Sequence, residues 1–234
     1  MSLSITWLGH SAFLLVTPGG KRIAIDPWLG NPMCPPEWSK PEALKPLDLI
    51  LVSHGHSDHV GDVVALSRAT NAPVVCIYEL GLFLGERGVQ NVRDMGIGGT
   101  QDIAGIQVTM TSALHSGSFV EDGRIVYLGG ATGFVLRAKD MPTIYFAGDT
   151  GLFGDMKIIG EIYKPDIAFL PIGDHYTMGP DTAAIAARWL GVRQVVPMHW
   201  GTFPMLAGTP SVLKTHLAGT GIDVLELKPG ETAR

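Results

Sequence analysis

The chain has 234 residues, of which 46% are hydrophobic and 17% are charged, with a formal net charge of −5. This composition excludes a disordered chain and supplies enough apolar side chains for one large domain over residues 1–234. Because Lys and Arg are scattered without a run or stripe, it disfavours a dedicated nucleic-acid surface. An anionic small molecule drawn to a cationic centre remains compatible with it.

The cysteines and the apolar runs indicate the cellular compartment in which the protein is expected. Cys34 and Cys76 lie in different segments and form no Cys-x-x-Cys pair, so we expect free thiols of a reducing compartment. The first residues lack a basic region followed by a long apolar run, and no later apolar run is long enough to span a bilayer. The sequence therefore predicts a cytoplasmic protein without a membrane segment, and it is compatible with a homo-oligomer.

Short apolar runs separated by Gly and Pro predict strands in the first part of the chain, at residues 5–8, 12–16, 22–25, 49–52 and 73–77. Helical spacing of apolar residues predicts helices over 60–70 and 79–87. Residues 30–46 contain five prolines and little periodicity, which indicates a surface loop. That loop either walls a pocket or is a passive connection.

In the second part the same signals predict strands near residues 92–93, 107–110, 134–137, 142–147, 167–172, 194–198 and 224–227. Helices are expected over 182–190 and 210–217. The halves before and after about residue 125 both consist of strands followed by helices, so the fold class is α/β with a hint of internal duplication.

One cluster of polar residues stands out from this background. His54, His56, Asp58 and His59 follow the buried apolar run 49–52, and composition alone gives such a pattern roughly 5 times in 10,000 chains of this kind. Three imidazoles and a carboxylate at a strand end would repel one another when protonated and lose hydration when neutral. A divalent cation removes this conflict, so the cluster predicts a metal site.

Further candidate residues also come directly after apolar strands. His115, Asp149 and His199 each do so, and one sheet edge could gather them with the cluster. His10 and Asp26 end strands as well, although each could equally be an ordinary turn or cap residue.

The sequence Ser-His-Gly-His-Ser-Asp-His at 53–59, with His115, Phe-Ala-Gly-Asp-Thr at 146–150 and Pro-Met-His-Trp at 197–200, resembles the metallo-β-lactamase superfamily. Within it, segments 7–11, 25–29 and 171–179 resemble bacterial metal-dependent hydrolases related to L-ascorbate-6-phosphate lactonase. The resemblance implies a four-layer αβ/βα sandwich, in which two mixed β-sheets are flanked by helices and a two-metal site lies at one edge.

The resemblance also implies which residues bind the metals. It assigns one ion to His54, His56 and His115, a second to Asp58, His59 and His199, and a bridging position to Asp149. Imidazoles and carboxylates suit two divalent ions of zinc, manganese, nickel or iron, with one position per ion left for water. The resemblance also indicates three catalytic candidates. Asp58 would orient a hydroxide, His175 would donate a proton to the leaving group, and His10 would lie beside the site. For His10, Asp26 and His175 the alternative role is hydrogen bonding that fixes loops.

The predicted function is a dinuclear metal-dependent hydrolase whose metal-bridging hydroxide attacks a phosphodiester, a lactone or another ester in a small molecule. A redox di-iron role is disfavoured because His56 provides nitrogen where flavodiiron members generally carry glutamate. A transfer-RNA nuclease is disfavoured because no long basic arm is present, and a secreted β-lactamase because there is no signal peptide. The alternatives are a mononuclear iron dioxygenase and a non-catalytic metal-binding sensor on the same scaffold.

Overall fold

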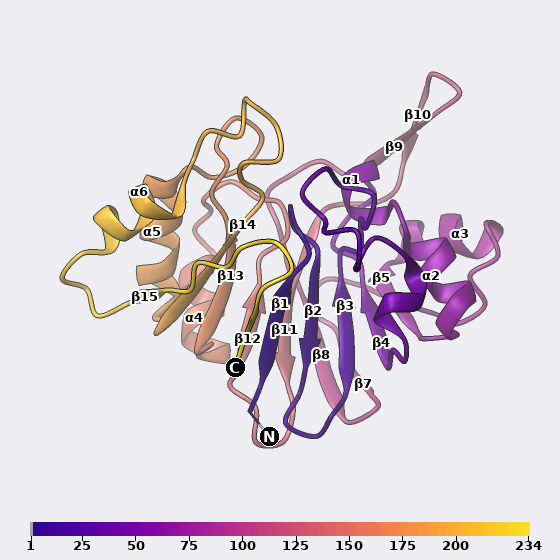
Figure 1. Cartoon of the computed structure of the whole chain (residues 1–234), viewed down its shortest axis with the longest axis horizontal. Helices are drawn as coiled ribbons and strands as arrows, with labels where there is room; N and C mark the ends of the chain where they lie inside the picture. The colour runs from indigo at the N-terminus through magenta and orange to yellow at the C-terminus, as the bar shows by residue number, and fades with distance from the viewer. Residues whose placement is uncertain (1) are drawn as a thin grey trace.

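The computed structural model describes residues 2–234, which form two large mixed β-sheets packed against each other with helices on the outside (Figure 1). The first sheet has the order β16-β1-β2-β3-β4-β5-β6. Its strands are β1 (Ser4–Trp7), β2 (Phe13–Val16), β3 (Arg22–Ile25), β4 (Leu49–Leu51), β5 (Val74–Ile77), β6 (Val92–Met95) and β16 (Thr232–Ala233).

The second sheet has the order β15-β14-β13-β12-β11-β8-β7. Its strands are β7 (Thr100–Ile103), β8 (Ile106–Ser112), β11 (Thr132–Arg137), β12 (Ile144–Phe146), β13 (Ile167–Pro171), β14 (Gln194–Met198) and β15 (Asp223–Val224). A separate hairpin of β9 (Ser118–Glu121) and β10 (Arg124–Tyr127) stands out from the body of the molecule (Figure 1).

The helices cover the outer faces of the two sheets (Figure 1). Beside the first sheet lie η1 (Pro41–Leu44), α1 (Ser57–Val60), α2 (Val63–Thr70) and α3 (Tyr78–Glu86). Beside the second lie α4 (Met156–Tyr163), α5 (Pro180–Leu190) and α6 (Pro210–Leu217). These layers confirm the predicted αβ/βα sandwich.

The two sheets share one pairing pattern, which creates the functional edge. In each sheet three antiparallel pairings are followed by three parallel ones, through β3-β4-β5-β6 and through β12-β13-β14-β15. The carboxyl ends of parallel strands meet at one edge of a sheet, where loops can gather reactive side chains. Strands inside these sheets are covered on both faces, which is why β4 is an uninterrupted buried run of Leu, Ile and Leu.

Aromatic side chains fill the space between the sheets. Phe13 of β2 contacts Phe169 of β13 edge-on, with ring centroids 4.9 Å apart, and Phe146 of β12 at 6.4 Å. All three rings are fully buried. This contact holds the two sheets, and therefore the loops at their common edge, in a fixed relation.

Several sequence predictions need correction. The helix expected over 60–70 begins only at Val63, as α2, and a separate short helix, α1, ends at Val60. Gly61 and Asp62 lie between the two helices, and the Asp62 carboxylate accepts the backbone N–H of Leu29 at 2.6 Å. The last predicted strand is only Asp223–Val224. The second sheet begins at Thr100, so the halves divide near residue 98 and not near residue 125.

Other predictions are confirmed. The helix over 210–217 has the predicted bounds, and the helix predicted at 182–190 begins two residues earlier, at Pro180. Both cysteines are free thiols. Among residues 2–234 no helix has both the length and the apolar character needed to cross a bilayer.

Candidate metal centre

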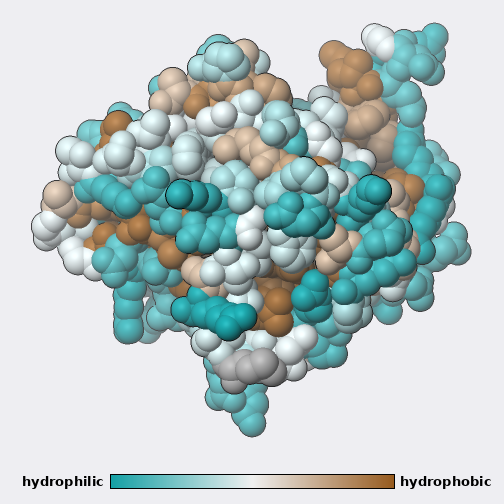
Figure 2. All heavy atoms as spheres, viewed as in Figure 1, coloured by the Kyte–Doolittle hydropathy of each residue, from teal (hydrophilic) through white to brown (hydrophobic). Residues whose placement is uncertain are grey.

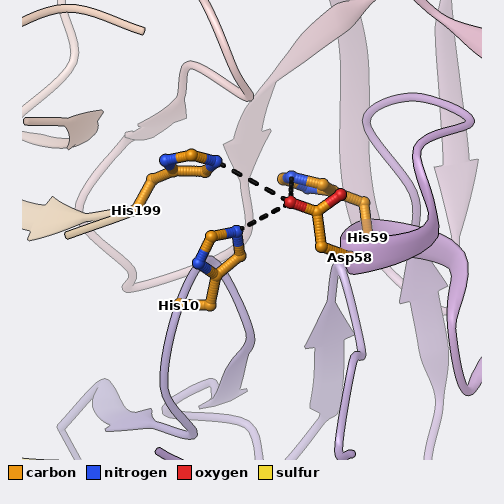
Figure 3. A group of neighbouring side chains, drawn as sticks. All are labelled: His10, Asp58, His59 and His199. Atoms are coloured by element: carbon orange, nitrogen blue, oxygen red, sulfur yellow. Dashed lines mark hydrogen bonds and ion pairs between the residues drawn. The ribbon is translucent and has the colours of Figure 1, made fainter. Parts of the chain in front are cut away.

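All seven residues predicted as metal ligands meet at the edge where the parallel strands end. Their nitrogen and oxygen atoms form overlapping groups in which every ligand atom lies within 4.8 Å of the others. The groups are His54, His56 and His115; His54, His59 and Asp149; and His10, Asp58, His59 and His199. Figure 3 shows the last group, with three imidazoles directed at the carboxylate of Asp58.

Short turns and left-handed backbone at the strand ends place these side chains. After β4 the chain enters α1, whose first turn carries Asp58 and His59, with His56 immediately before it. His199 directly follows β14 and has a φ of 54°, and Gly148 directly before Asp149 has a φ of 63°. Such φ values are uncommon for residues with side chains and mark positions where the surrounding structure dictates the backbone.

Asp149 lies at the middle of the cluster. Its Oδ2 atom is 3.0 Å from Nε2 of His199 and 3.3 Å from Nε2 of His59. The same oxygen is 3.8 Å from Nε2 of His115 and 4.0 Å from Nε2 of His54. One carboxylate oxygen therefore reaches imidazoles from both predicted ligand sets, as a bridging ligand must.

Asp26 fixes the orientation of two of the histidines through hydrogen bonds. Its Oδ2 accepts Nδ1–H of His59 at 2.7 Å and the hydroxyl of Ser53 at 2.6 Å, while Oδ1 accepts the Ser53 backbone N–H at 2.7 Å. Because the Ser53 hydroxyl donates to Asp26, its oxygen accepts Nδ1–H of His54 at 2.9 Å. Both Nδ1 atoms donate these hydrogen bonds, which leaves Nε2 as the nitrogen through which His54 and His59 would bind a cation.

His56 and His115 complete the first group of histidines. Nδ1 of His56 lies 2.9 Å from Nε2 of His54, and Nε2 of His56 lies 3.3 Å from the Ser116 hydroxyl. Ser116 immediately follows His115, so the segment leading into the hairpin β9–β10 is held against the ligand loop.

His10 lies against the second group. Its Nε2 is 3.0 Å from Oδ2 of Asp58, and its Nδ1 is 2.8 Å from the Thr202 hydroxyl. The backbone carbonyl of His10 accepts the N–H of His199 at 3.1 Å. His10 is fully buried, with Trp28 edge-on at 5.4 Å between ring centroids. It therefore positions both Asp58 and His199.

Burial and charge separate the pKa values of the cluster. Burial lowers the pKa of His54 well below its usual value and lowers that of His10 to about 4. Burial also lowers the pKa of His56 and of His115. These four imidazoles are neutral near pH 7, which is the form that binds metals.

His59 and the carboxylates behave differently. Burial alone would lower the pKa of His59, but the carboxylates of Asp149, Asp26 and Asp58 raise it well above its usual value. Burial alone would raise the pKa of Asp149, but His199 and His59 hold it well below its usual range. The pKa of Asp58 is also lowered: burial opposes the shift, and His59 and His10 cause it. The cluster thus concentrates negative charge that favours a cation.

The side chains present fit a metal centre. Oδ1 of Asp149 is buried without a hydrogen-bond partner within residues 2–234, and Nε2 of His59 has only its ion-pair contact with Oδ2 of Asp149 at 3.3 Å, although buried polar atoms are rarely left without a hydrogen bond. A cation would satisfy both atoms, and nitrogen and carboxylate ligands of this kind suit zinc and similar divalent ions.

The structure separates the remaining candidates. His10 and Asp26 contact the ligands, whereas His175 is exposed, donates its backbone N–H to Asp174 at 2.9 Å and packs its ring against Tyr176. Among residues 2–234 no hydrogen bond or ion pair joins His175 to the cluster, and its role as proton donor stays a prediction. Sequence reasoning missed Ser53 and Thr202, because single hydroxyl residues carry no pattern.

The fold and this edge of histidines and aspartates define a β-lactamase-superfamily domain, and a model of that family, the beta-lactamase superfamily domain, matches residues 21–200. The chain is 49% identical over 231 residues to a UPF0173 metal-dependent hydrolase of Koribacter versatilis, covering 98% of this chain and 97% of that protein. A UPF0173 metal-dependent hydrolase of Roseiflexus castenholzii is 45% identical over 234 residues, covering 98% and 96%. The chain belongs to the UPF0173 metal-dependent hydrolases.

A solved structure agrees with this assignment. Igni18, described as a novel metallo hydrolase from the hyperthermophilic archaeon Ignicoccus hospitalis, aligns with a TM-score of 0.87 and 37% identity, covering 100% of this chain and 98% of that one. The predicted superfamily membership is therefore confirmed, and the resemblance to L-ascorbate-6-phosphate lactonase stays a prediction.

Proposed function

We propose that this protein hydrolyses a phosphodiester, a lactone or another ester with two divalent ions bound at the candidate centre. The position of Asp149 Oδ2, within 4.0 Å of the Nε2 atoms of His54, His59, His115 and His199, carries this proposal. A centre for one ion would not need a carboxylate shared between two groups of histidines.

The division of ligands follows the two outer groups. His54, His56 and His115 would hold one ion, Asp58, His59 and His199 the other, and Asp149 would contact both. Zinc, manganese, nickel and iron all suit these ligands. When bound, such ions supply a water molecule of lowered pKa and polarise the substrate oxygen.

The chain's own groups prepare the site for hydrolysis. Asp26 fixes the tautomers of His54 and His59, and His10 holds one oxygen of Asp58. Asp58 is partly exposed, with a side-chain accessibility of 27%, and its lowered pKa keeps it ionised. It is therefore placed to accept a proton from an attacking water. His175 is retained in this proposal as donor of a proton to the leaving group.

The proposal also covers the cellular location of the enzyme and the size of its substrate. Free Cys34 and Cys76 support a reducing compartment, and we propose a cytoplasmic enzyme acting on a small molecule. Two complete ligand groups favour hydrolysis at a dinuclear centre over a mononuclear iron dioxygenase or a sensor without activity.

A substrate panel tests this function. Purified protein freed of metal is supplied with Mn²⁺, Zn²⁺, Ni²⁺ or Fe²⁺ and assayed on bis(p-nitrophenyl) phosphate, p-nitrophenyl acetate and γ-butyrolactone. We expect metal-dependent turnover of at least one ester class, and a loss of about 100-fold or more in kcat for Asp58→Ala. Stoichiometric metal binding without turnover of any ester would contradict the proposal, and oxygen consumption with iron alone would favour the dioxygenase.

A further inference from the structure

Exposed apolar side chains lie on both sides of the candidate metal centre. On one side is Leu114, directly before the ligand His115, with 62% of its surface exposed. On the other side is Phe203, which is 38% exposed and whose ring centroid lies 6.2 Å from that of His10. Large apolar side chains exposed beside a polar centre are a feature of ligand-binding sites.

Leu114 is held rigidly in this position. Its backbone N–H donates to the Thr150 hydroxyl at 2.9 Å, and its carbonyl accepts the N–H of Gly151 at 3.1 Å. Both partners lie in the two residues after Asp149. The exposed leucine is thus fixed between the segments that carry His115 and Asp149, and its exposure is not a consequence of a loose loop.

The hairpin β9–β10 extends the apolar surface from the same segment. Its alternating residues present two faces, and one face packs on α3 through Phe119 against Phe83. The opposite face carries Val120, Ile125 and Tyr127, which are 65%, 79% and 70% exposed. Figure 2 shows hydrophobic atoms on this projecting hairpin, below a hydrophilic turn.

Charge around the centre limits what can bind there. The segments that meet at this edge, residues 8–12, 26–34, 52–62, 113–131, 147–155, 172–179 and 198–209, contain no Lys and a single Arg, Arg124 at the hairpin turn. Two divalent ions would be opposed by the carboxylates of Asp26, Asp58 and Asp149, which leaves the centre at most one net positive charge. A substrate with several negative charges would find no further cation.

We propose that the preferred substrate is an ester with at most one negative charge and with an apolar substituent next to the scissile bond. This substituent would pack against Leu114, Phe203 and the exposed hairpin face that carries Val120, Ile125 and Tyr127. This inference rests on the hydrolase function proposed above. Leu114 precedes the ligand His115 and the ring of Phe203 lies beside His10, so both apolar side chains border the centre. The scarcity of cations there disfavours sugar phosphates and nucleic acids as substrates.

Equilibrium binding of alkyl hydroxamates tests the inference independently of turnover, because the hydroxamate group binds metal ions and the tail reports on its surroundings. Calorimetry on the metal-loaded protein compares acetohydroxamate with hexanohydroxamate. We expect the longer compound to bind about tenfold or more tightly, since each fully buried methylene contributes a factor of about four. Adipic monohydroxamate, which replaces the terminal methyl group by a carboxylate, should bind at least about tenfold more weakly than hexanohydroxamate.

Two variants and a matched control assign the effect to these residues. Leu114→Ser and Phe203→Ser should each reduce the advantage of the longer tail, to about threefold or less. Val212→Ser, which changes a 45% exposed apolar residue on α6, should keep the full advantage.

The failures can be told apart. Equal Kd values for the short and long hydroxamates would overturn this inference while leaving the metal centre in place. Absence of binding by either compound would contradict the metal centre and the proposed function with it. A dimer in sedimentation equilibrium that Leu114→Ser dissociates would show that the apolar surface is an interface between copies of the chain, and would also overturn the inference.

Discussion

Oδ2 of Asp26 accepts a hydrogen bond from Nδ1 of His59 at 2.7 Å, and both side chains are fully buried. Through the Ser53 hydroxyl the same carboxylate also fixes His54. One aspartate that belongs to neither ligand group thus sets the tautomer of a histidine in each. Partners of this kind orient metal-binding histidines and raise their basicity.

Asp26→Asn should weaken metal binding by about 10- to 100-fold, because both oxygens of Asp26 accept hydrogen bonds, from Ser53 and His59, and the amide has only one accepting oxygen. The measurement is a competition titration with a chromophoric chelator. Asp48→Asn is the control, since Asp48 pairs with Lys21 at 2.8 Å and makes no contact with the ligands. Equal metal affinity in Asp26→Asn and the wild type would show that the hydrogen bond has no influence on the centre.

Metal binding should release protons, and the affinity should increase with pH. Burial alone would lower the pKa of His59, but Asp149, Asp26 and Asp58 raise it well above its usual value. In the metal-free protein at pH 7 this imidazole therefore holds a second proton, on Nε2. A cation at Nε2 has to displace that proton. Calorimetry in two buffers of different ionisation enthalpy should give about one proton or more per chain, and a value of zero would contradict the role of His59 as a ligand.

Gly148→Ala should disrupt the placement of Asp149. Gly148 has a φ of 63°, and a Cβ atom there would overlap the carbonyl oxygen of Thr132. We expect a loss of about 2 kcal/mol or more in the free energy of unfolding, together with weaker metal binding. Gly154→Ala is the matched control, because a Cβ atom at that position meets nothing within 4 Å. Chemical denaturation of both variants measures the difference, and equal stabilities would count against this explanation.

The two thiols should react slowly in the native protein. Burial, with smaller effects of Asp62 and Glu37, raises the pKa of Cys34 to about 11, and burial together with Asp94 raises that of Cys76 to about 12. Only thiolates react, so at pH 8 we expect reaction with Ellman's reagent at least about a hundredfold slower than for free cysteine. Cys76, which is fully buried, should react only after unfolding. Rapid labelling of both thiols under native conditions would contradict their burial.

The ligand positions could be predicted from the sequence because they obey a simple physical rule. His54, His115, Asp149 and His199 each come after a buried apolar strand, and parallel strands end at a common edge. The contacts that organise them could not be predicted in this way. Thr202 reaches His10 across 192 residues, and a single threonine in a loop gives no signal of such a partner.

Local signals also failed where tertiary contacts override them. The interruption at Gly61 and Asp62 depends on the bond from Leu29 to the Asp62 carboxylate, 33 residues away in the sequence. The helix α4 was missed although Met156 and Ile159 lie at helical spacing and are buried. In the hairpin β9–β10 the exposed Val120 and Ile125 pair across the strands, and the sequence does not show which of their faces is covered.

The most direct test of the central claim is the number of metal ions bound per chain. Protein loaded with Mn²⁺ or Zn²⁺, desalted and analysed by inductively coupled plasma mass spectrometry should contain two ions per chain, and Asp149→Ala should contain one or none because both groups share its carboxylate. Wild-type protein that saturates at one ion per chain, or an Asp149→Ala variant that retains both, would contradict the dinuclear centre.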